Sequence, residues 1–407
     1  MKICIIGGGT LGWWCAGHLE KHHPNFDITL IESDTIPAIG VGESTLPQVA
    51  TFLKGLGLKE EEWMPKCHAV KKLGNMKRGW THLSDQPTTF WSNENDPFNK
   101  WVELYLAGKK TRDDFDIDLN KDKSIYAYHL DANLAGQVVK DICEKTKHEV
   151  RTLTELPEGY DLYVDCTGLH RQFVNDKSMM DFEHHLVDRA LVAPFEIPQS
   201  HKPGYTQTIA RDSGWQFIVD TSERIGSGYI YSSKYETEES ALDKFKEYTS
   251  KFTSYKNIQP RLIKWKPEVL KNPWSGNVVA IGLAGGWLDP LEANGLFIGQ
   301  YGITLLSQCL DRRVGSQAYN RAMRKVWRDN SSFILHHYML SNREDTDFWR
   351  YYKQFDARKS LWENYQKYSN RFTNLYPDSI WASLAVLYDE FKYYKGKQHG
   401  YESIRPA

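Results

Sequence analysis

A glycine-rich turn close to the N-terminus restricts the possible folds more than any other feature of this chain. Gly7, Gly9 and Gly12 follow the short apolar run 2–6, and a helix-compatible stretch begins at Trp13. A strand, a G-x-G-x-x-G turn and a helix in this order are typical of a βαβ unit whose parallel strands are buried on both faces. The chain is therefore predicted to begin with a Rossmann-like α/β layer.

The same turn also predicts a ligand. Glycines let the backbone approach a pyrophosphate closely, and the N-terminus of the following helix offers it N–H groups. A second apolar run, 27–31, ends at Glu32, where a carboxylate accepts hydrogen bonds from ribose hydroxyls. A structural turn without a ligand is the alternative, and the turn does not distinguish FAD from NAD. We expect a dinucleotide to be bound by Gly7, Gly9, Thr10, Gly12 and Glu32.

Composition excludes several classes of function. The 407 residues include 51 Lys+Arg and 52 Asp+Glu, a balance that argues against a surface devoted to nucleic acid. No apolar run reaches the ~18 residues of a membrane span, and the N-terminal apolar run is too short for a signal peptide. The 6 cysteines stand singly, without C-x-x-C spacing. We expect a cytoplasmic protein with reduced thiols and with no metal, nucleic-acid or membrane partner.

Hydrophobic periodicity predicts further elements along the chain. Helices are expected at 48–56, at 132–145 and from about residue 295, and strands at 160–164, 215–219, 228–233 and 277–281. Gly226, Ser227 and Gly228 predict a turn between two antiparallel strands. The expected organisation is a module at 1–330, with a substrate-side sheet inserted at about 170–270, followed by a helical segment at 331–407.

Six segments occur along the chain in an order and spacing that are more specific than any one of them. They are 7–13, 39–47, Trp63-Met64-Pro65 with Lys72 seven residues later, 161–168, 281–295, and 336–338 with 343–350. Together they resemble the flavin-dependent halogenases of the tryptophan-halogenase type over nearly the whole chain. The resemblance implies an FAD-binding fold of the flavin monooxygenase type, with an antiparallel substrate-side sheet and a helical C-terminal part.

The resemblance also implies a reaction and its partners. In that family FAD, used as FADH2, reacts with oxygen and a halide ion to produce hypohalous acid, which passes to a lysine and halogenates an electron-rich aromatic carbon. A separate flavin reductase and a small aromatic substrate are therefore expected, while a homo-oligomer and a monomer both remain open. Beyond the first turn, the implied flavin contacts are Gly40, Gly42, Glu43, Ser44, Gly282, Leu283 and Asp289.

Lys72 and Glu292 match the catalytic lysine and the substrate-side glutamate of the family. A buried amine orients a hypohalous acid, and a carboxylate accepts the ring proton. The alternatives are a solvated charged run for Lys72, which has Lys71 as its neighbour, and a helix N-terminal carboxylate for Glu292. Asn294 and Gly295 fall where the family binds halide through backbone N–H groups.

Three departures from the family leave other functions open. The family's Trp-x-Trp-x-Ile-Pro motif is degenerate at 215–220, which favours a flavin monooxygenase that hydroxylates an aromatic substrate. Ala293 and Asn294 replace the usual Ser-Thr pair, which predicts an altered anion pocket, and the C-terminal part is short. A flavin-binding protein without catalysis is the third alternative. His336 and His337 lack an acidic ligand at metal spacing, so they are expected to be packing or surface residues.

Overall fold

A mostly parallel sheet forms the base of the molecule in this computed structural model, which describes residues 1–35, 42–81, 87–89, 109, 126–196, 204–251 and 259–355. The strand order is β17-β18-β9-β1-β2-β8, and only β17 pairs in the antiparallel direction. This confirms the strands predicted at the N-terminus and near residues 160 and 278. The bounds are β1 Lys2–Ile6, β2 Asp27–Glu32, β8 Lys147–Val150, β9 Leu162–Asp165, β17 Trp274–Ser275 and β18 Val278–Ala280.

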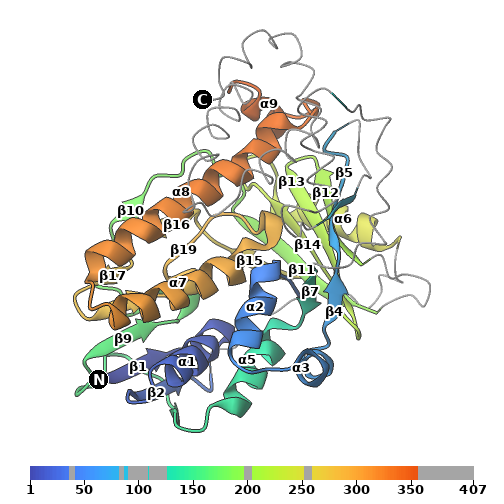
Figure 1. The fold of residues 1–407 in the computed structure, drawn as a ribbon. Coiled ribbons are helices and arrows are strands. Elements are labelled where there is room, and N and C mark those ends of the chain that lie inside the picture. Colours follow the sequence, from blue (N-terminus) through green and yellow to red (C-terminus); the bar gives the residue numbers. More distant parts are fainter. Residues whose placement is uncertain are drawn as a thin grey trace.

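Three helices pack beside this sheet and form its main hydrophobic core: α1 (Thr10–His22), α5 (Ala132–Ile142) and α7 (Asn294–Asp311) (Figure 1). Helix α1 lies between the other two, so residues from Gly12 to Leu19 are all buried. Gly17 permits the close contact with α5, because a Cβ there would lie 2.6 Å from Val139 Cγ1. The Trp14 indole donates a hydrogen bond to the Ala135 carbonyl at 3.1 Å.

A second, larger sheet lies beyond the first, with the order β15-β11-β14-β13-β12-β5-β6. All its pairings are antiparallel except that between β12 and β5. Strands β5 and β6 come from outside the range 170–270 in which this sheet was expected. The bounds are β5 Gly74–Arg78, β6 Pro87–Thr89, β11 Arg189–Phe195, β12 Tyr205–Arg211, β13 Gly214–Asp220, β14 Ile225–Tyr231 and β15 Arg261–Lys264.

The turn predicted at residues 226–228 was wrong, because these residues lie inside β14. Gly228 faces the aromatic ring of Phe217, and a Cβ there would lie 2.4 Å from Phe217 Cε1. The turn between β13 and β14 lies at residues 221–224, where the Thr221 hydroxyl and backbone N–H both donate to the Arg224 carbonyl at 2.8 Å. The glycine therefore serves ring packing rather than chain reversal.

Two small sheets and several short helices join the large sheets. The first small sheet, β3-β7-β4, brings Ser44 and Lys72 to the two sides of one strand. The bounds are β3 Glu43–Ser44, β4 Val70–Lys72, β7 Ala127–Leu130, β10 Met179–Met180, β16 Glu268–Leu270 and β19 Gly286–Trp287. The helices here are α2 Pro47–Gly55, α3 Glu60–Lys66, α6 Glu238–Thr249, η2 Gly168–His170, η4 Gly282–Ala284 and η5 Leu291–Ala293.

Helix α8 (Ser316–Leu340) runs from the edge of the parallel sheet near β17 to the large sheet, where α9 (Asp347–Tyr352) follows (Figure 1). The expected boundary between residues 330 and 331 falls inside this continuous helix. The expected C-terminal segment beyond residue 355 lies outside the described residues. Within the part of the chain that is described, no helix is long and apolar enough to cross a membrane, and no group of His, Cys, Asp or Glu is arranged to hold a metal ion.

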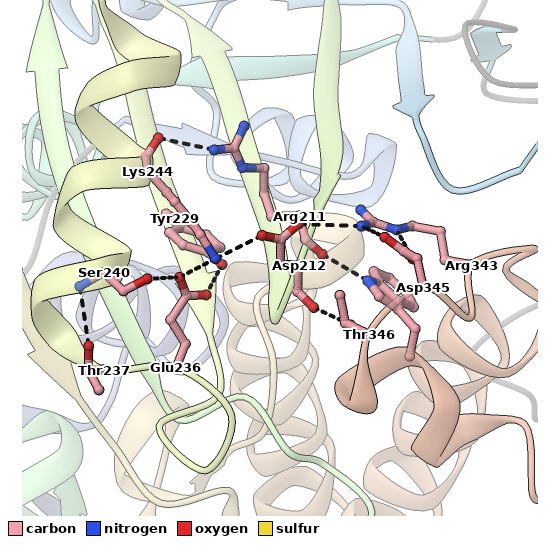
Figure 2. A network of polar contacts seen from close by, with 11 residues as sticks. Arg211, Asp212, Tyr229, Glu236, Thr237, Ser240, Lys244, Arg343, Asp345 and Thr346 are labelled. Carbon is pink, nitrogen blue, oxygen red and sulfur yellow. Dashed lines mark hydrogen bonds and ion pairs between the residues drawn. The ribbon is translucent and has the colours of Figure 1, made fainter.

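Helix α9 and the residue before it are hydrogen-bonded to the β12–β13 hairpin (Figure 2). Thr346 Oγ1 donates to the Asp212 carbonyl at 2.6 Å, and Trp349 Nε1 donates to the Arg211 carbonyl at 2.8 Å. The Asp212 carboxylate also pairs with Lys244 of α6 at 2.8 Å. These contacts tie the helical part directly to the large sheet.

Candidate functional site

The first glycine turn forms an open cradle at the carboxyl end of β1. Gly7 has a φ of 112°, a left-handed conformation that favours glycine. Gly12 allows the chain to fold back, because a Cβ there would lie 1.9 Å from the Gly7 carbonyl oxygen. A Cβ on Gly9, in contrast, would meet nothing within 4 Å, and no side chain caps the N-terminus of α1. The cradle therefore has room and helix N–H donors for a phosphate.

Glu32 borders this cradle, as expected from its place at the end of β2. A Cβ on Gly8 would lie 1.6 Å from Glu32 Oε2, so the carboxylate sits directly against the turn. His148 Nε2 lies 2.6 Å and Lys140 Nζ 3.4 Å from Glu32 Oε1. The Thr10 hydroxyl, expected at the cofactor, donates to the Ala132 carbonyl at 2.8 Å and so holds α5 beside the cradle.

Residues of the segment 281–295 lie close to the same turn. Gly282 has a φ of 68°, and a Cβ there would lie 2.4 Å from Leu11 Cδ1, so η4, with Leu283, lies against the start of α1. Asp289 is buried, and it accepts hydrogen bonds from the Tyr338 hydroxyl at 2.5 Å and from the Leu291 N–H at 3.0 Å. Burial raises the pKa of Asp289 to about 6. These bonds shape the loop that leads to Glu292.

The second glycine loop leads into β3. Gly40 lies outside the described residues, and Gly42 has a φ of 88°. Burial and the nearby Asp131 charge raise the pKa of Glu43 to about 7. The Ser44 hydroxyl lies 2.8 Å from Thr206 Oγ1 and accepts a hydrogen bond from Lys72. The loop expected at the flavin is thus bonded directly to the predicted catalytic lysine.

Lys72 is fully buried, so the interpretation as part of a solvated charged run is wrong for this residue. Its ammonium donates to Ser44 Oγ at 2.7 Å and to the Thr45 carbonyl at 3.1 Å. Burial lowers the pKa of Lys72 to about 7; the Lys77 charge adds to this effect, and the Glu292 charge opposes it. Lys71, its neighbour on β4, points the other way and pairs at 2.9 Å with Glu60.

Glu292 lies in η5, before α7, with a φ of 68°, and Ala293 follows with a φ of 57°. Two successive non-glycine residues in this conformation store backbone strain, which clusters at functional sites. The carboxylate pairs with the Lys77 ammonium and accepts a hydrogen bond from Asn75 Nδ2 at 3.1 Å. His337 Nε2 lies 3.3 Å from Glu292 Oε1.

The charge state of Glu292 follows from these neighbours. Burial alone raises the pKa of Glu292, but Lys77 and His337 outweigh it and hold this pKa well below its usual range. Because its partners are side chains of β5 and α8, the helix-dipole interpretation does not account for its position. Glu292 is an ionised carboxylate inside the protein.

Asn294 and Gly295, expected at the halide, form the start of α7. Asn294 is buried, and its side-chain amide donates to the Leu291 carbonyl at 2.9 Å. A Cβ on Gly295 would lie 2.8 Å from Trp287 Cζ3, so the helix start passes close to an indole ring. The N-cap residue, Ala293, has no polar side chain that could cap the helix. Backbone N–H groups there suit an anion.

Three residues of this site were missed by sequence reasoning: Asn75, Lys77 and His337. No strand was predicted over 74–78, so the alternation that puts Asn75 and Lys77 on one face was not recognised. His337 was expected to pack or to face solvent; it is buried, and it also contacts the candidate carboxylate. The signal in the sequence that could have predicted this strand was the alternation of polar Asn75 and Lys77 around Met76, shortly after Lys72.

A glycine cradle at the carboxyl end of a parallel strand is typical of dinucleotide-binding oxidoreductases, and a buried lysine and a buried carboxylate elsewhere in the fold are groups that can act in catalysis. The chain belongs to the tryptophan halogenase family, whose profile matches residues 2–101 and 93–395. It is a flavin-dependent halogenase, and the family resemblance and fold class predicted from the sequence are both confirmed. Membership in this family implies the use of flavin and halide.

Three similar proteins are named as tryptophan halogenases. Tryptophan 7-halogenase RebH of Lentzea aerocolonigenes is 28% identical, with 90% of this chain and 81% of RebH covered. Tryptophan 6-halogenase SttH of Streptomyces toxytricini is 27% identical, with 86% of this chain and 80% of SttH covered. The structure of Tar14, a tryptophan C-6 flavin-dependent halogenase (chlorinase) from taromycin biosynthesis, superimposes with a TM-score of 0.81 at 23% identity, covering 95% of this chain and 90% of Tar14.

Proposed function

We propose that this halogenase acts on an electron-rich aromatic or heteroaromatic compound and that Lys72 delivers the halogen. The observation that carries the proposal is the buried Lys72 ammonium bonded to Ser44 of the second glycine loop. A lysine in this position costs stability, because burial opposes its charge. A chemical role explains why the fold retains it.

The flavin site proposed here consists of the cradle and the loops around it. Gly9 and the uncapped N-terminus of α1 hold the pyrophosphate, and Glu32 accepts hydrogen bonds from the ribose. The remaining flavin contacts are Gly7, Thr10, Gly12, Gly40, Gly42, Glu43, Ser44, Gly282, Leu283 and Asp289. Bound FADH2, supplied by a separate flavin reductase, provides the reducing equivalents with which oxygen and a halide become hypohalous acid.

The halide site proposed here is formed by the backbone N–H groups at Asn294 and Gly295. An anion needs donors without a strict geometry, which an uncapped helix start offers. Ala293 and Asn294 replace the Ser-Thr pair usual in the family, so chloride, bromide and iodide are all to be tested.

Lys72 has two ways to present the halogen. As an ammonium it donates a hydrogen bond to the oxygen of hypohalous acid and orients the molecule. As a neutral amine it attacks the halogen, so that an N–halogen bond forms and water leaves. Because the pKa of Lys72 lies at about 7, both forms are present near neutral pH.

Glu292 is proposed to stabilise the cationic ring formed when the carbon–halogen bond appears. The ring then loses a proton, which the carboxylate accepts, and aromaticity returns. In the overall reaction arene and hypohalous acid become haloarene and water, so atoms and charges balance. The curated relatives named above are tryptophan halogenases, and a small aromatic substrate of indole, phenol or aniline type is the one to test first.

The competing function is hydroxylation of an aromatic substrate by a flavin monooxygenase. The observation in its favour is the degenerate segment on β13, where Trp215 is kept but Phe217 replaces the second tryptophan. Phe217 packs against Gly228 of β14, so its ring contributes to packing within the sheet.

The test is an incubation with FAD, NADH, a flavin reductase and catalase, with each halide and a panel of arenes, read by mass spectrometry. Halogenated product is expected from the natural chain and is expected to vanish in Lys72→Ala. Lys71→Ala is the matched control, because Lys71 is exposed and paired with Glu60. Hydroxylated product, or halogenation that persists in Lys72→Ala, contradicts the proposal.

A further inference from the structure

A second buried lysine stands beside the candidate site. The Lys77 side chain is 3% exposed and forms an ion pair with Glu292 Oε1. Isolated buried ammonium groups are costly, and a lysine in the interior is usually paired. The sequence places Lys77 only five positions after Lys72, so one short segment carries two buried lysines into one site.

Two elements of the fold hold the Glu292 carboxylate. Asn75 and Lys77 share one face of β5, and they contact the two different carboxylate oxygens. His337 of α8 lies near the same oxygen as Lys77, with Nε2 3.3 Å from Oε1, and its Nδ1 lies 2.9 Å from the Phe333 carbonyl, which fixes the ring. The carboxylate is therefore held in one orientation, toward β5 and α8.

The same carboxylate is also near enough to Lys72 for their charges to interact. Glu292 raises the pKa of Lys72 and Lys77 lowers it. The other titratable group facing Lys72 within the described residues is His129 of β7, whose pKa is lowered to about 3 by burial and by the Lys72 charge. His129 is neutral at ordinary pH, so among the described residues the charges that act on Lys72 are those of Glu292 and Lys77.

We propose that Lys77 is a positioning residue: it binds the Glu292 carboxylate to β5 and so prevents Glu292 from becoming the ion-pair partner of Lys72. The inference rests on the proposed function in that it assigns Lys72 and Glu292 their separate tasks. A buried carboxylate that loses one cation turns to the next, because an unpaired buried charge is costly. Without Lys77, two groups can take its place: His337, whose Nε2 lies 3.3 Å from Glu292 Oε1 and whose pKa Lys77 lowers, and Lys72, whose charge Glu292 already stabilises.

This arrangement has a chemical consequence. A Lys72 paired directly with Glu292 keeps its proton to higher pH, and a protonated amine cannot attack a halogen. Lys77 therefore keeps Lys72 able to lose its proton near neutral pH, which the neutral-amine route of halogen transfer requires.

The test measures Lys72 directly and needs no turnover. The full chain with FAD is labelled with [13Cε]lysine, the Lys72 signal is assigned by its loss in Lys72→Met, and its pKa is followed by NMR between pH 5 and 11. In Lys77→Met the Lys72 pKa is expected to rise by about 1 unit, since it loses a like charge and gains a partner. Lys71→Met is the matched control and is expected to leave the Lys72 pKa unchanged. Lys77→Arg keeps the cation, so its Lys72 pKa is expected to stay close to that of the natural chain.

A double-mutant cycle separates positioning from simple repulsion between the lysines. If Lys77 acts through Glu292, Lys77→Met shifts the Lys72 pKa less in a Glu292→Gln background than in the natural chain. An equal shift in both backgrounds, or no upward shift in Lys77→Met, overturns the proposal. The double variant lacks both buried charges. If Lys77→Met alone does not fold, the double variant is compared with Glu292→Gln, and a Lys72 pKa that is higher by the full shift of about 1 unit in the double variant overturns the proposal. Because the titration is independent of halogenation, its result stands whatever the activity assay shows.

Discussion

Replacing Lys72 by methionine is predicted to change the free energy of unfolding in a way that depends on pH. In the folded chain the pKa of Lys72 is lowered to about 7 from the ordinary 10.5. Below pH 7 both the folded and the unfolded chain carry this proton, and the folded state bears the full cost of a buried charge. Between these two pKa values the unfolded chain binds more protons, so the stability of the natural chain rises with pH.

The size of the effect follows from the shift. Each pH unit in this window contributes about 1.4 kcal/mol, and the whole window amounts to roughly 5 kcal/mol, an order-of-magnitude figure. Lys72→Met removes the proton and its cost, but it also leaves Ser44 Oγ and the Thr45 carbonyl without this donor, at about 1–3 kcal/mol per group. At pH 6 the relief of the buried charge stabilises Lys72→Met and the lost hydrogen bonds destabilise it. The informative quantity is therefore the slope with pH of the difference in unfolding free energy between the two chains.

The assay is urea denaturation of both chains at pH 5, 6, 7, 8 and 9 at one FAD concentration, since bound ligand adds its own stabilisation. The natural chain is expected to gain about 1.4 kcal/mol per pH unit over Lys72→Met from pH 7 to 9 and to show no such gain between pH 5 and 6. Lys71→Met is the control and is expected to give no slope in that range. A stability difference that is flat with pH would refute the burial argument for Lys72.

Two further predictions concern the cradle and the C-terminal helices. Gly9→Ala is expected to fold normally, because its Cβ meets open space, but to weaken FAD binding about tenfold or more in a fluorescence titration. Unchanged FAD affinity in Gly9→Ala would contradict the placement of the pyrophosphate. Gly12→Ala is instead expected to lower the melting temperature, since its Cβ would meet the Gly7 carbonyl at 1.9 Å. Thr346→Val removes the hydrogen bond to the Asp212 carbonyl and is expected to cost about 1 kcal/mol in urea denaturation; no loss would show that the remaining contacts of Figure 2 hold this segment without it.

Most of the N-terminal unit was predictable from the sequence. The strands Lys2–Ile6 and Asp27–Glu32 and the glycine turn between them follow local rules, because glycine spacing and apolar runs act through the backbone of neighbouring residues. The predicted helix near Gly295 is also found, beginning at Asn294. Prediction failed at Gly226–Gly228, where glycines that suggest a turn instead make room for the Phe217 ring on the adjacent strand.

By itself, then, the sequence determined the glycine turn, the order of the motifs and the family, since each depends on residues close together in the chain or on spacing alone. Only the tertiary structure decided which charged side chains are buried. Lys71 and Lys72 are adjacent and chemically alike, yet one pairs at the surface and the other is enclosed beside Ser44. The contacts among Lys77, Glu292 and His337 join β5, η5 and α8, and burial by such distant elements sets the pKa values on which the chemistry depends.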